Sequence, residues 1–580
     1  MNTPWVSISR IGLLLLGVLL PLAVYPLDVR ITVKGLNGDL KTNVLAFLSV
    51  EQEKKRESLT PSRLRLLHKR ATEEIRKALQ PFGYFKPRVE GRLEQKDEIY
   101  WLTYQIEPGP QVRLGEVDFQ VAGEGRNDPR VNTRFPLSEG DALDQVAYEK
   151  AKQQLLADTV EAGYLNARYT KHQLQVDLER YSASIRLHLD TGVRFFFGEV
   201  HFLQDVMNPE FLNRYVRFRP GDPYSYEKLL TLQSNLIDSE YFKSVEVHAQ
   251  RERAEGDRVP IDIELTPNKR DRYRIGLGYS TDTGPRLTLD WKRRRVGPNG
   301  HRMRSELRVS KPHSTLSAEY LIPLQRPSKD YLSYGASSDR YDTDSRKGYL
   351  TLVNARQSVG SEIGWRRTVG LDYSYESYEL ADQEDIAFLL VPNIQWTRLK
   401  TDKKDFLLSG YKLDYRLEGA YDKFFSKTSY LQFSTHDKGI YGLNEDWRLL
   451  ARVDLGATRT DDLLKLPASK RFFAGGDNSI RGFDFEKLGP TNADGELVGG
   501  RYLAVGSVEL ERRIAGKWSG AVFFDAGNAF DPDYEAKVEY GAGFGVRWRS
   551  PVGPLRVDFA SGLSADETQL RLHVVIGPEL

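Results

Sequence analysis

The chain has 580 residues, a net charge of +2 and no cysteine. A chain of this length favours two or more domains. The near-neutral charge argues against a nucleic-acid-binding protein, because such proteins usually carry a strong basic excess. The absence of cysteine excludes disulfide bridges, cysteine-ligated zinc and thiol catalysis. It is compatible with an oxidising compartment, where stray thiols are a liability.

The first 26 residues have the order of a secretory signal. Arg10 precedes an apolar core at 11–20, and Pro21 and the small residue Ala23 follow it. We see no other apolar run of this kind, so helical membrane spans beyond the N-terminus are excluded. We predict a cleaved signal peptide over 1–26, with an uncleaved membrane anchor as the alternative.

An internal repeat occupies the first half of the chain. Gly109 is followed six residues later by Gly115-Glu116-Val117, and Gly192 is followed six residues later by Gly198-Glu199-Val200. Both segments are typical of a turn that leads into a strand. Helical stretches then run from Tyr148 to Gly163 and from Tyr226 to Glu240, and an earlier one runs from Arg63 to Leu79. The glycine just past a helix is a stop signal, because it accepts the left-handed backbone.

Two strand-like runs follow each of these helices, such as Ser244 to Ala249 and Pro260 to Thr266. The pattern predicts three α+β units with the order strand, helix, helix, strand, strand, each a small sheet with helices on one face. We place them at 27–109, 110–190 and 191–266. The alternative is that the repeats are only a spacer.

From Arg272 onward the hydrophobic pattern has a period of two. One face of each run is apolar or aromatic and the other is charged or glycine, as in 286–292. A soluble sandwich also alternates, but its outward face is rarely so densely charged in every strand. We therefore predict a 16-stranded antiparallel transmembrane β-barrel over 267–580. Its strands are expected to begin near residues 272, 286, 301, 315, 329, 346, 362, 386, 409, 428, 446, 501, 517, 538, 554 and 569.

Only one connection in the barrel region is long, and it runs from 460 to 500. Long structureless loops are uncommon unless they are functional. This one contains Arg481, Gly482 and Phe483, and the next two strands carry Glu509 and Asp525. By alternation both acids point into the lumen, on adjacent strands about 4.8 Å apart.

The planar fork of Arg481 can bridge the two acids, and Gly482 lets the chain turn tightly beside it. The loop would then enter the barrel and be pinned to its inner wall. The alternative is a solvated arginine, with Glu509 and Asp525 only tuning the lumen.

The sequence gives no argument for catalysis. Two facing carboxylates also occur in glycoside hydrolases, but no substrate cleft can be argued. The motifs of serine hydrolases, zinc proteases and P-loop proteins are absent from the sequence. Gly541, Gly543 and Gly545 mimic a dinucleotide fingerprint, but they lie within an alternating strand. We expect no enzymatic activity, no cofactor and no metal site.

Three late motifs resemble the BamA/TamA superfamily of outer-membrane assembly proteins. They are Arg481-Gly482-Phe483, the run Phe523-Phe524-Asp525-Ala526-Gly527, and the run from Arg547 to Arg556. The repeats resemble the polypeptide-transport-associated (POTRA) domains of that family. Their number and the ending Ile576-Gly577-Pro578-Glu579-Leu580 are similar to the TamA branch. Leu580 departs from most outer-membrane barrels, which end in an aromatic residue.

The resemblance implies that Arg481 is the family's loop arginine, with Glu509 and Asp525 as its partners. It also implies a lateral gate between the first and last strands. A weak seam agrees with the sequence there, because Gly276 and Gly278 offer no side chain to pack. Pro578 cannot donate to a strand ladder. The expected gate residues are Tyr273, Ile275, Gly276, Leu277, Gly278, Leu572, Val574, Ile576, Gly577 and Pro578.

An exposed strand edge is a template for another strand, which a client barrel could add there. The alternative is that the glycines simply fit a crowded lumen. We therefore expect a Gram-negative outer-membrane protein with periplasmic N-terminal domains. Its expected role is to insert or translocate client proteins such as autotransporters.

The resemblance further implies an inner-membrane-anchored, TamB-like periplasmic partner, and the lipid bilayer is the other expected contact. No nucleic acid is expected as a partner. An anchor or conduit for phospholipid transfer is the alternative function. A passive pore would need neither three repeats nor a plugging loop.

Overall fold

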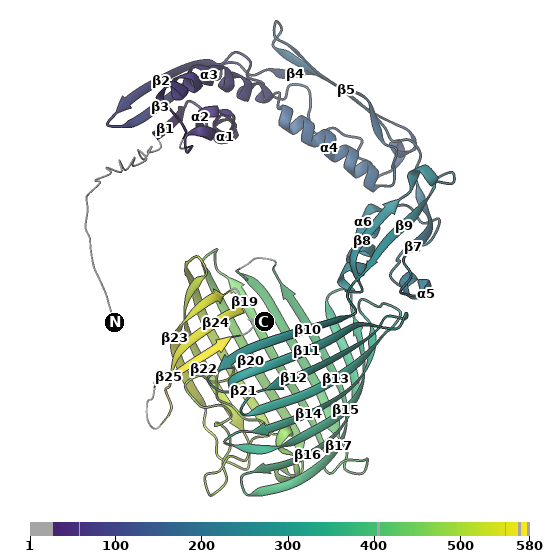
Figure 1. Cartoon of the computed structure of the whole chain (residues 1–580), viewed down its shortest axis with the longest axis vertical. Coiled ribbons are helices and arrows are strands. Elements are labelled where there is room, and N and C mark those ends of the chain that lie inside the picture. Colours follow the sequence, from purple (N-terminus) through teal and green to yellow (C-terminus); the bar gives the residue numbers. More distant parts are fainter. Residues whose placement is uncertain (1–26, 57, 403–405, 551–552, 566–569, 577–580) are drawn as a thin grey trace, which may run out of the picture. The chain divides into compact units, whose positions relative to one another are not determined.

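The structure is a computed structural model that describes residues 27–56, 58–402, 406–550, 553–565 and 570–576. The predicted signal peptide and the gate residues Gly577 and Pro578 lie outside the described residues. The described chain forms three small three-stranded sheets and one closed barrel of sixteen strands (Figure 1). No described helix is both long and apolar enough to cross a membrane.

The first repeat is a three-stranded sheet of order β1-β3-β2, in which β1 runs parallel to β3. Its longest helix, α3, begins where the Thr60 side chain accepts a hydrogen bond from the Arg63 amide, with Pro61 at the first helical position. One face of this helix is buried in the core of the repeat. The elements are β1 (Asp28–Lys34), α1 (Gly38–Phe47), α2 (Ser49–Glu53), α3 (Pro61–Leu79), β2 (Arg88–Lys96) and β3 (Ile99–Glu107).

The second and third repeats have the same strand arrangement, with sheet orders β4-β6-β5 and β7-β9-β8. The second comprises β4 (Arg113–Ala122), α4 (Gln145–Glu161), β5 (Arg168–Asp177) and β6 (Ser182–Asp190). The third comprises β7 (Phe196–Leu203), α5 (Pro209–Asn213), α6 (Tyr226–Asp238), β8 (Phe242–Ala249) and β9 (Arg258–Pro267).

The predicted element order is wrong for the second repeat. Where a first helix was expected, the chain forms only a short 3-10 turn, η2 (Glu124–Asn127). Gly123 has a positive φ of +85° with an extended ψ, and Pro129 follows the turn, so a longer helix is not favoured there. The second repeat therefore packs one α-helix against its sheet.

The prediction of a 16-stranded antiparallel barrel is confirmed, and every strand begins within three residues of its predicted start. The strands are β10 (Asp271–Ser280), β11 (Gly284–Val296), β12 (His301–Val309), β13 (His313–Pro323), β14 (Tyr331–Asp342), β15 (Arg346–Gly360), β16 (Trp365–Leu380), β17 (Gln383–Thr401), β18 (Ser409–Ala420), β19 (Tyr430–Gly442), β20 (Trp447–Thr460), β21 (Tyr502–Ala515), β22 (Trp518–Phe530), β23 (Glu539–Ser550), β24 (Gly553–Gly562) and β25 (Leu570–Ile576).

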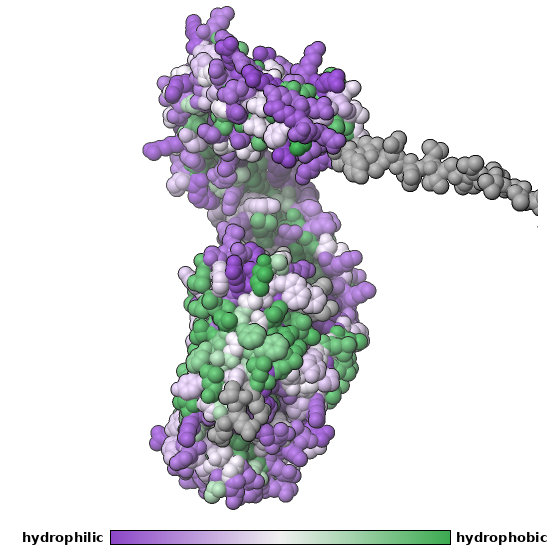
Figure 2. All heavy atoms as spheres, turned by 90° about the vertical axis from the view of Figure 1, so that its left-hand side faces the viewer, coloured by the Kyte–Doolittle hydropathy of each residue, from purple (hydrophilic) through white to green (hydrophobic). Residues whose placement is uncertain are grey.

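The alternation along the strands separates an apolar outer face from a polar inner face. On β16, Leu371 and Tyr373 are exposed on the outside, whereas Asp372 between them is buried and bonds to Arg356 at 2.9 Å. Figure 2 shows the hydrophobic residues of the barrel gathered in a belt between hydrophilic ends. This arrangement suits a wall that faces lipid outside and a polar lumen inside.

The third repeat is fastened to the barrel end that holds the turn between β11 and β12. The Tyr241 hydroxyl donates to the Gly300 carbonyl at 2.5 Å, and the Arg302 Nε donates to that hydroxyl at 2.9 Å. The Glu240 carboxylate accepts from Lys292 at 2.9 Å. These buried and half-buried polar contacts hold the repeat against the first strands of the barrel.

Candidate functional site: a loop inside the barrel and the seam beside it

The connection between β20 and β21, residues 461–501, lies inside the lumen. Its residues Leu466, Ala468 and Ile480 are fully buried. Two contacts tie it to the wall: the Ser469 amide donates to Glu376 on β16 at 2.9 Å, and Arg346 on β15 pairs with Glu486 at 2.7 Å. The loop is thus attached to the barrel wall at several strands.

Arg481 is the centre of the strongest of these attachments. Its Nε and Nη2 donate to Asp525 at 2.8 and 2.9 Å, and its Nη1 donates to Glu509 at 2.8 Å and to Asp558 at 3.3 Å. Its Nη2 also reaches the Ser507 hydroxyl at 3.2 Å. The structure therefore brings the two predicted acids onto the predicted arginine and adds a third acid, from β24.

The guanidinium of Arg481 is a buried charge whose three nitrogens all donate hydrogen bonds. It is 4% exposed and its guanidinium lies 3.4 Å from the centre of the Phe523 ring. Burial alone would lower the pKa of Arg481, but the hydrogen bonds and charges of Asp525 and Glu509 outweigh it and raise the pKa. Removing one partner of such a pair typically costs about 3–5 kcal/mol, because the other charge is left buried alone.

A second arginine completes the network and was missed by the sequence analysis. Arg547 on β23 donates to Glu509 at 2.8 Å and also pairs with Asp558. Asp558 lies between outward Val557 and Phe559 in an alternating strand, so its lumen orientation could have been read from the pattern. The pattern does not show which lumen-facing residues of different strands lie at the same height in the barrel.

Gly482 and Phe483 let the loop lie closely against the last strands. Gly482 has φ +95°, and a Cβ there would lie 2.4 Å from the Gly562 nitrogen. Its amide donates to His573 on β25 at 3.0 Å. The Phe483 ring packs against Gly562, where a Cβ would meet it at 2.8 Å. A side chain larger than hydrogen at 482 or 562 would push the loop off the wall.

The described residues of the first and last strands of the barrel form a seam with very little pairing. Among the described residues, Ser280 opposite Val575 is the single strand pair between β10 and β25. Two longer contacts flank it: the Thr281 amide donates to the Val574 carbonyl at 3.3 Å, and the Val574 amide donates to the Thr281 hydroxyl at 3.2 Å. The edge of β10 that faces β25 has no strand partner before Ser280 within the described part of the chain.

The predicted gate residues that the structure describes lie on these two strands, but those of β10 do not lie opposite those of β25. Tyr273, Ile275 and Leu277 are among the most exposed apolar side chains of the barrel, at 75%, 74% and 82%. The pairing of Ser280 with Val575 places all three beyond the described end of β25. A Cβ at Gly276 would meet only ordinary contacts, the nearest 3.6 Å away. Crowding therefore does not require glycine at this position.

Asp477 of the loop, Asp282 of the turn after β10 and His573 of β25 converge at the seam. Their ligand atoms lie close enough to one another to hold a metal ion. However, His573 Nε2 accepts the Gly482 amide, so the proton of a neutral ring sits on Nδ1, which donates to Asp477 at 2.5 Å. A metal on Nδ1 would force a proton onto Nε2, facing the Gly482 N–H. The cluster is therefore best described by hydrogen bonds.

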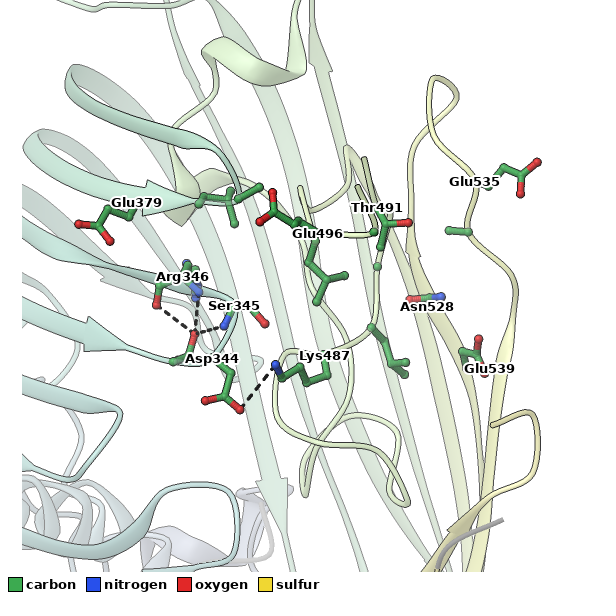
Figure 3. Close-up of a pocket in the computed structure, with 18 of the residues that line it drawn as sticks. Asp344, Ser345, Arg346, Glu379, Lys487, Thr491, Glu496, Asn528, Glu535 and Glu539 are labelled. Atoms are coloured by element: carbon green, nitrogen blue, oxygen red, sulfur yellow. Dashed lines mark hydrogen bonds and ion pairs between the residues drawn. The ribbon is translucent and has the colours of Figure 1, made fainter. Parts of the chain in front are cut away.

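At the barrel end that carries the long loop, the loop borders a cavity of about 730 Å³ (Figure 3). Its lining mixes both signs of charge, including Arg346, Lys487, Glu496 and Glu539. Lys487 pairs with Asp344 at 3.6 Å across the cavity wall. This mixed and open lining suits a hydrated mouth, and we assign no ligand to it.

Comparisons with known families agree with this architecture. Residues 298–579 match the Omp85 superfamily domain. Residues 30–108 match the model described as POTRA domain TamA domain 1, and residues 195–268 match a POTRA model described as surface antigen variable number repeat. The barrel region therefore belongs to the Omp85 superfamily and is preceded by POTRA domains.

Individual relatives are more distant. The chain is 23% identical over 565 residues to the outer membrane protein assembly factor BamA of Neisseria meningitidis serogroup B, covering 84% of this chain and 69% of that protein. It is 24% identical over 376 residues to BamA of Nitratidesulfovibrio vulgaris, covering 61% of this chain but only 46% of that protein.

A solved structure shares the fold. The crystal structure of BamA from Haemophilus ducreyi lacking POTRA domains 1–3 superposes with a TM-score of 0.70 at 17% identity, covering 80% of this chain and 99% of that one. Together with the sixteen-stranded barrel, these matches identify an outer-membrane protein of Gram-negative type with its POTRA domains in the periplasm. The particular resemblance to TamA stays a prediction.

Proposed function

We propose that this protein is an assembly factor that inserts or secretes client outer-membrane proteins, such as autotransporters, by opening its barrel between β10 and β25. The observation that carries the proposal is the seam, where the described residues contribute one strand pair. A closed barrel otherwise has no free edge. A wall with a single weak joint can open there without breaking a full strand ladder.

The edge of β10 would serve as the template for a client strand. From Asp271 to Tyr279 its outer margin offers backbone groups that no described strand of this chain pairs on that side. An incoming strand could bond to them by β-augmentation. Apolar side chains such as Ile275 would then meet the lipid-facing row of the client.

The loop inside the lumen supports an assembly role over a passive pore. Arg481, Glu509 and Asp525 would hold it against the wall, so that the lumen stays filled while the seam is closed. We propose no catalytic step and no cofactor. The periplasmic repeats would recruit an inner-membrane-anchored, TamB-like partner, a proposal supported by the match of residues 30–108 to a TamA domain model.

The test uses the absence of cysteine from the chain. Antiparallel pairs have Cα atoms about 4.5–5.5 Å apart, within reach of a disulfide. Ser280→Cys with Val575→Cys places two thiols at the one pair of the seam. Cysteine pairs that join Tyr273, Ile275 or Leu277 to a described residue of β25 would not lie opposite each other, so they would not form a disulfide. We expect the oxidised variant to lose client insertion and to regain it after reduction.

The matched control joins two strands that should never part. Val369→Cys with Ile394→Cys places the same bridge in the long β16–β17 ladder, and insertion should continue when it is oxidised. Full insertion by the locked Ser280–Val575 variant would overturn lateral opening. If that lock instead changed outer-membrane phospholipid levels while client proteins were unaffected, the alternative role in lipid transfer would replace assembly.

A further inference from the structure

We propose that Asp477 is a positioning residue that couples the seating of the loop to the closure of the seam. This inference rests on the proposed lateral opening. Its basis is that one buried carboxylate, carried by the loop, bonds to both margins of the seam at once. When the loop is seated, Asp477 completes the joint between β10 and β25; when the loop leaves, the joint loses most of the bonds that its described residues make.

The first margin is held at the end of β10. The hydroxyls of Ser280 and Thr281 both donate to the Asp477 carboxylate, the second at 3.0 Å. The Asp477 amide in turn donates to the Asp282 carboxylate at 2.6 Å. Three consecutive residues of the first margin thus bond to one residue of the loop.

The second margin is held through His573 of β25. Its Nδ1 donates to the same Asp477 carboxylate at 2.5 Å, and its Nε2 accepts the Gly482 amide at 3.0 Å. The imidazole is therefore bonded on both sides by the loop. His573 is 4% exposed and Asp477 is 5% exposed, so water competes little for these bonds.

The bonds made by Asp477 outweigh those that the strands make directly. Among the described residues, direct contact between the strands consists of the Ser280–Val575 pair and two longer bonds between Thr281 and Val574. Hydrogen bonds to a carboxylate are roughly twice as strong as those between neutral groups. Among the described residues, the bonds through Asp477 therefore contribute more to holding β10 and β25 together than the direct bonds do, although Asp477 belongs to neither strand.

The segment that carries Asp477 also carries the arginine of the loop. Within it, the Ser479 amide donates to the Gly476 carbonyl at 3.0 Å and the Gly476 amide donates to the Ile480 carbonyl at 3.2 Å. This tight turn makes 476–481 one compact piece. Displacing Arg481 from Asp525 would therefore pull Asp477 from the seam, which is how loop and gate become coupled.

Asp484, another carboxylate of the loop, also contacts β25, but it differs from Asp477 in its exposure to solvent. Asp484 pairs with Arg571 of β25, but it is 54% exposed at its side chain and contacts that margin in an ion pair open to solvent. An exposed pair of this kind contributes little. Asp477 is the loop carboxylate that is buried and that bonds to both strands of the seam.

The test measures hydrogen–deuterium exchange of the full-length protein in lipid nanodiscs, with no client present. Asp477→Ala removes two bonds on the first margin and one on the second. We expect exchange at the Thr281 and Val574 amides to rise by about tenfold or more, since each lost bond contributes on the order of a factor of five. Asp477→Asn keeps the size and one acceptor, so its effect should be intermediate.

Two controls separate coupling from general loosening. Glu486→Gln weakens the loop where it meets Arg346 on β15, away from the seam, and should leave exchange at Thr281 unchanged. Arg481→Lys should raise exchange at Thr281 although Arg481 makes no contact with β10 or β25 side chains in the described structure. Adding Asp477→Ala to Arg481→Lys should then produce little further increase.

The outcomes are distinct. Unchanged exchange at both seam amides in Asp477→Ala and Asp477→Asn would overturn the inference, whatever clients do. Faster exchange in Asp477→Ala but not in Arg481→Lys would reduce Asp477 to a local seam contact and overturn the coupling. Faster exchange in both, with client insertion still unaffected by the Ser280–Val575 disulfide, would leave the coupling standing and overturn the proposed function.

Discussion

Two joints of the same barrel wall differ in how they are made. Between β16 and β17 the strand pairing runs without interruption from Trp365 opposite Arg398 to Leu380 opposite Gln383. Between β10 and β25 the described residues give one pair and two bonds between Thr281 and Val574, and a residue of a third segment bonds to both strands. The first joint depends on backbone groups of the two strands. The second depends on where a loop lies.

The difference teaches that closure of a barrel need not be uniform. A long ladder opens only if many backbone bonds break together, which is costly away from water. A joint of side-chain bonds can open when a single segment shifts, because the described parts of the two strands make few bonds to each other. The predictions below test this contrast between the two joints.

The largest effect is expected when the loop loses its arginine. Arg481→Ala leaves Asp525 buried without its cation and leaves Glu509 with Arg547 alone, so we expect the barrel to lose about 3–5 kcal/mol of stability. The temperature at which the folded band disappears in gel-mobility assays measures this loss. Arg571→Ala, which removes a partly exposed ion pair, is the control and should change it little. An unchanged transition in Arg481→Ala would contradict the described network.

A smaller effect is expected at Gly482. In Gly482→Ala the new Cβ would meet the Gly562 nitrogen at 2.4 Å in a backbone conformation that alanine disfavours. We expect a loss of about 1–3 kcal/mol and faster exchange at the seam. Gly439→Ala is the matched control, since a Cβ there meets nothing within 4 Å. Equal behaviour of the two variants would show that the loop does not need this close approach.

The seam should also respond to pH. Burial, and the charge of Asp477, raise the pKa of Asp282 to about 7. Because the pKa of this acid is raised by closure, the closed seam is most stable while Asp282 is protonated and loses stability as the pH rises through 7. Burial raises the pKa of Asp477, but the hydrogen bonds from His573 and Ser280 outweigh it and lower the pKa, so Asp477 stays ionised in this window.

We therefore expect exchange at Thr281, corrected for its intrinsic pH dependence, to rise by about tenfold between roughly pH 5.5 and pH 8. His573 and Asp477 are the titratable groups that face Asp282. The variant Asp282→Asn removes the titrating carboxyl of Asp282 and leaves His573 and Asp477 in place. In that variant the dependence should disappear. Exchange of the β16–β17 amides should not depend on pH in the parent protein or in Asp282→Asn. A pH dependence at Thr281 that survives in Asp282→Asn would show that another group causes it.

The smallest effect is expected on β10 itself. Gly276→Ala meets no close contact and restricts the open strand, so it should stabilise β10 by about 0.5–1 kcal/mol. Exchange along β10 should fall slightly while that of β16 stays the same. Destabilisation by this variant would mean that the glycine is needed for packing in the lumen.

Much of this architecture is predictable from sequence because it depends on local periodicity. The period of two located all sixteen strands, and the long interval between β20 and β21 marked the loop. Arg481, Glu509 and Asp525 could be grouped because the two acids lie on consecutive strands with the same orientation. The missing helix of the second repeat was less visible, since Gly123 and Pro129 interrupt a segment that is otherwise polar.

The rest depends on register between distant segments. His573 meets Asp477 only because the last strand closes on the first, and no pattern within either strand fixes that offset. Asp558 and Arg547 join Glu509 for the same reason, since the stagger of neighbouring strands sets which lumen residues share a level. The offset of β25 against β10 also explains why the predicted gate residues of these two strands, as far as the structure describes them, do not face one another.

The attachment of the third repeat has a mechanical consequence. Tyr241 and Glu240 bond to the turn before β12, to β11 and, through Arg272 at 3.8 Å, to β10. A force applied to this repeat from the periplasm therefore acts on the first strands of the barrel. One of them, β10, is a margin of the seam. Moving the repeat would pull on β10 together with β11 and the turn before β12, so the work of parting the seam could be done from outside the membrane.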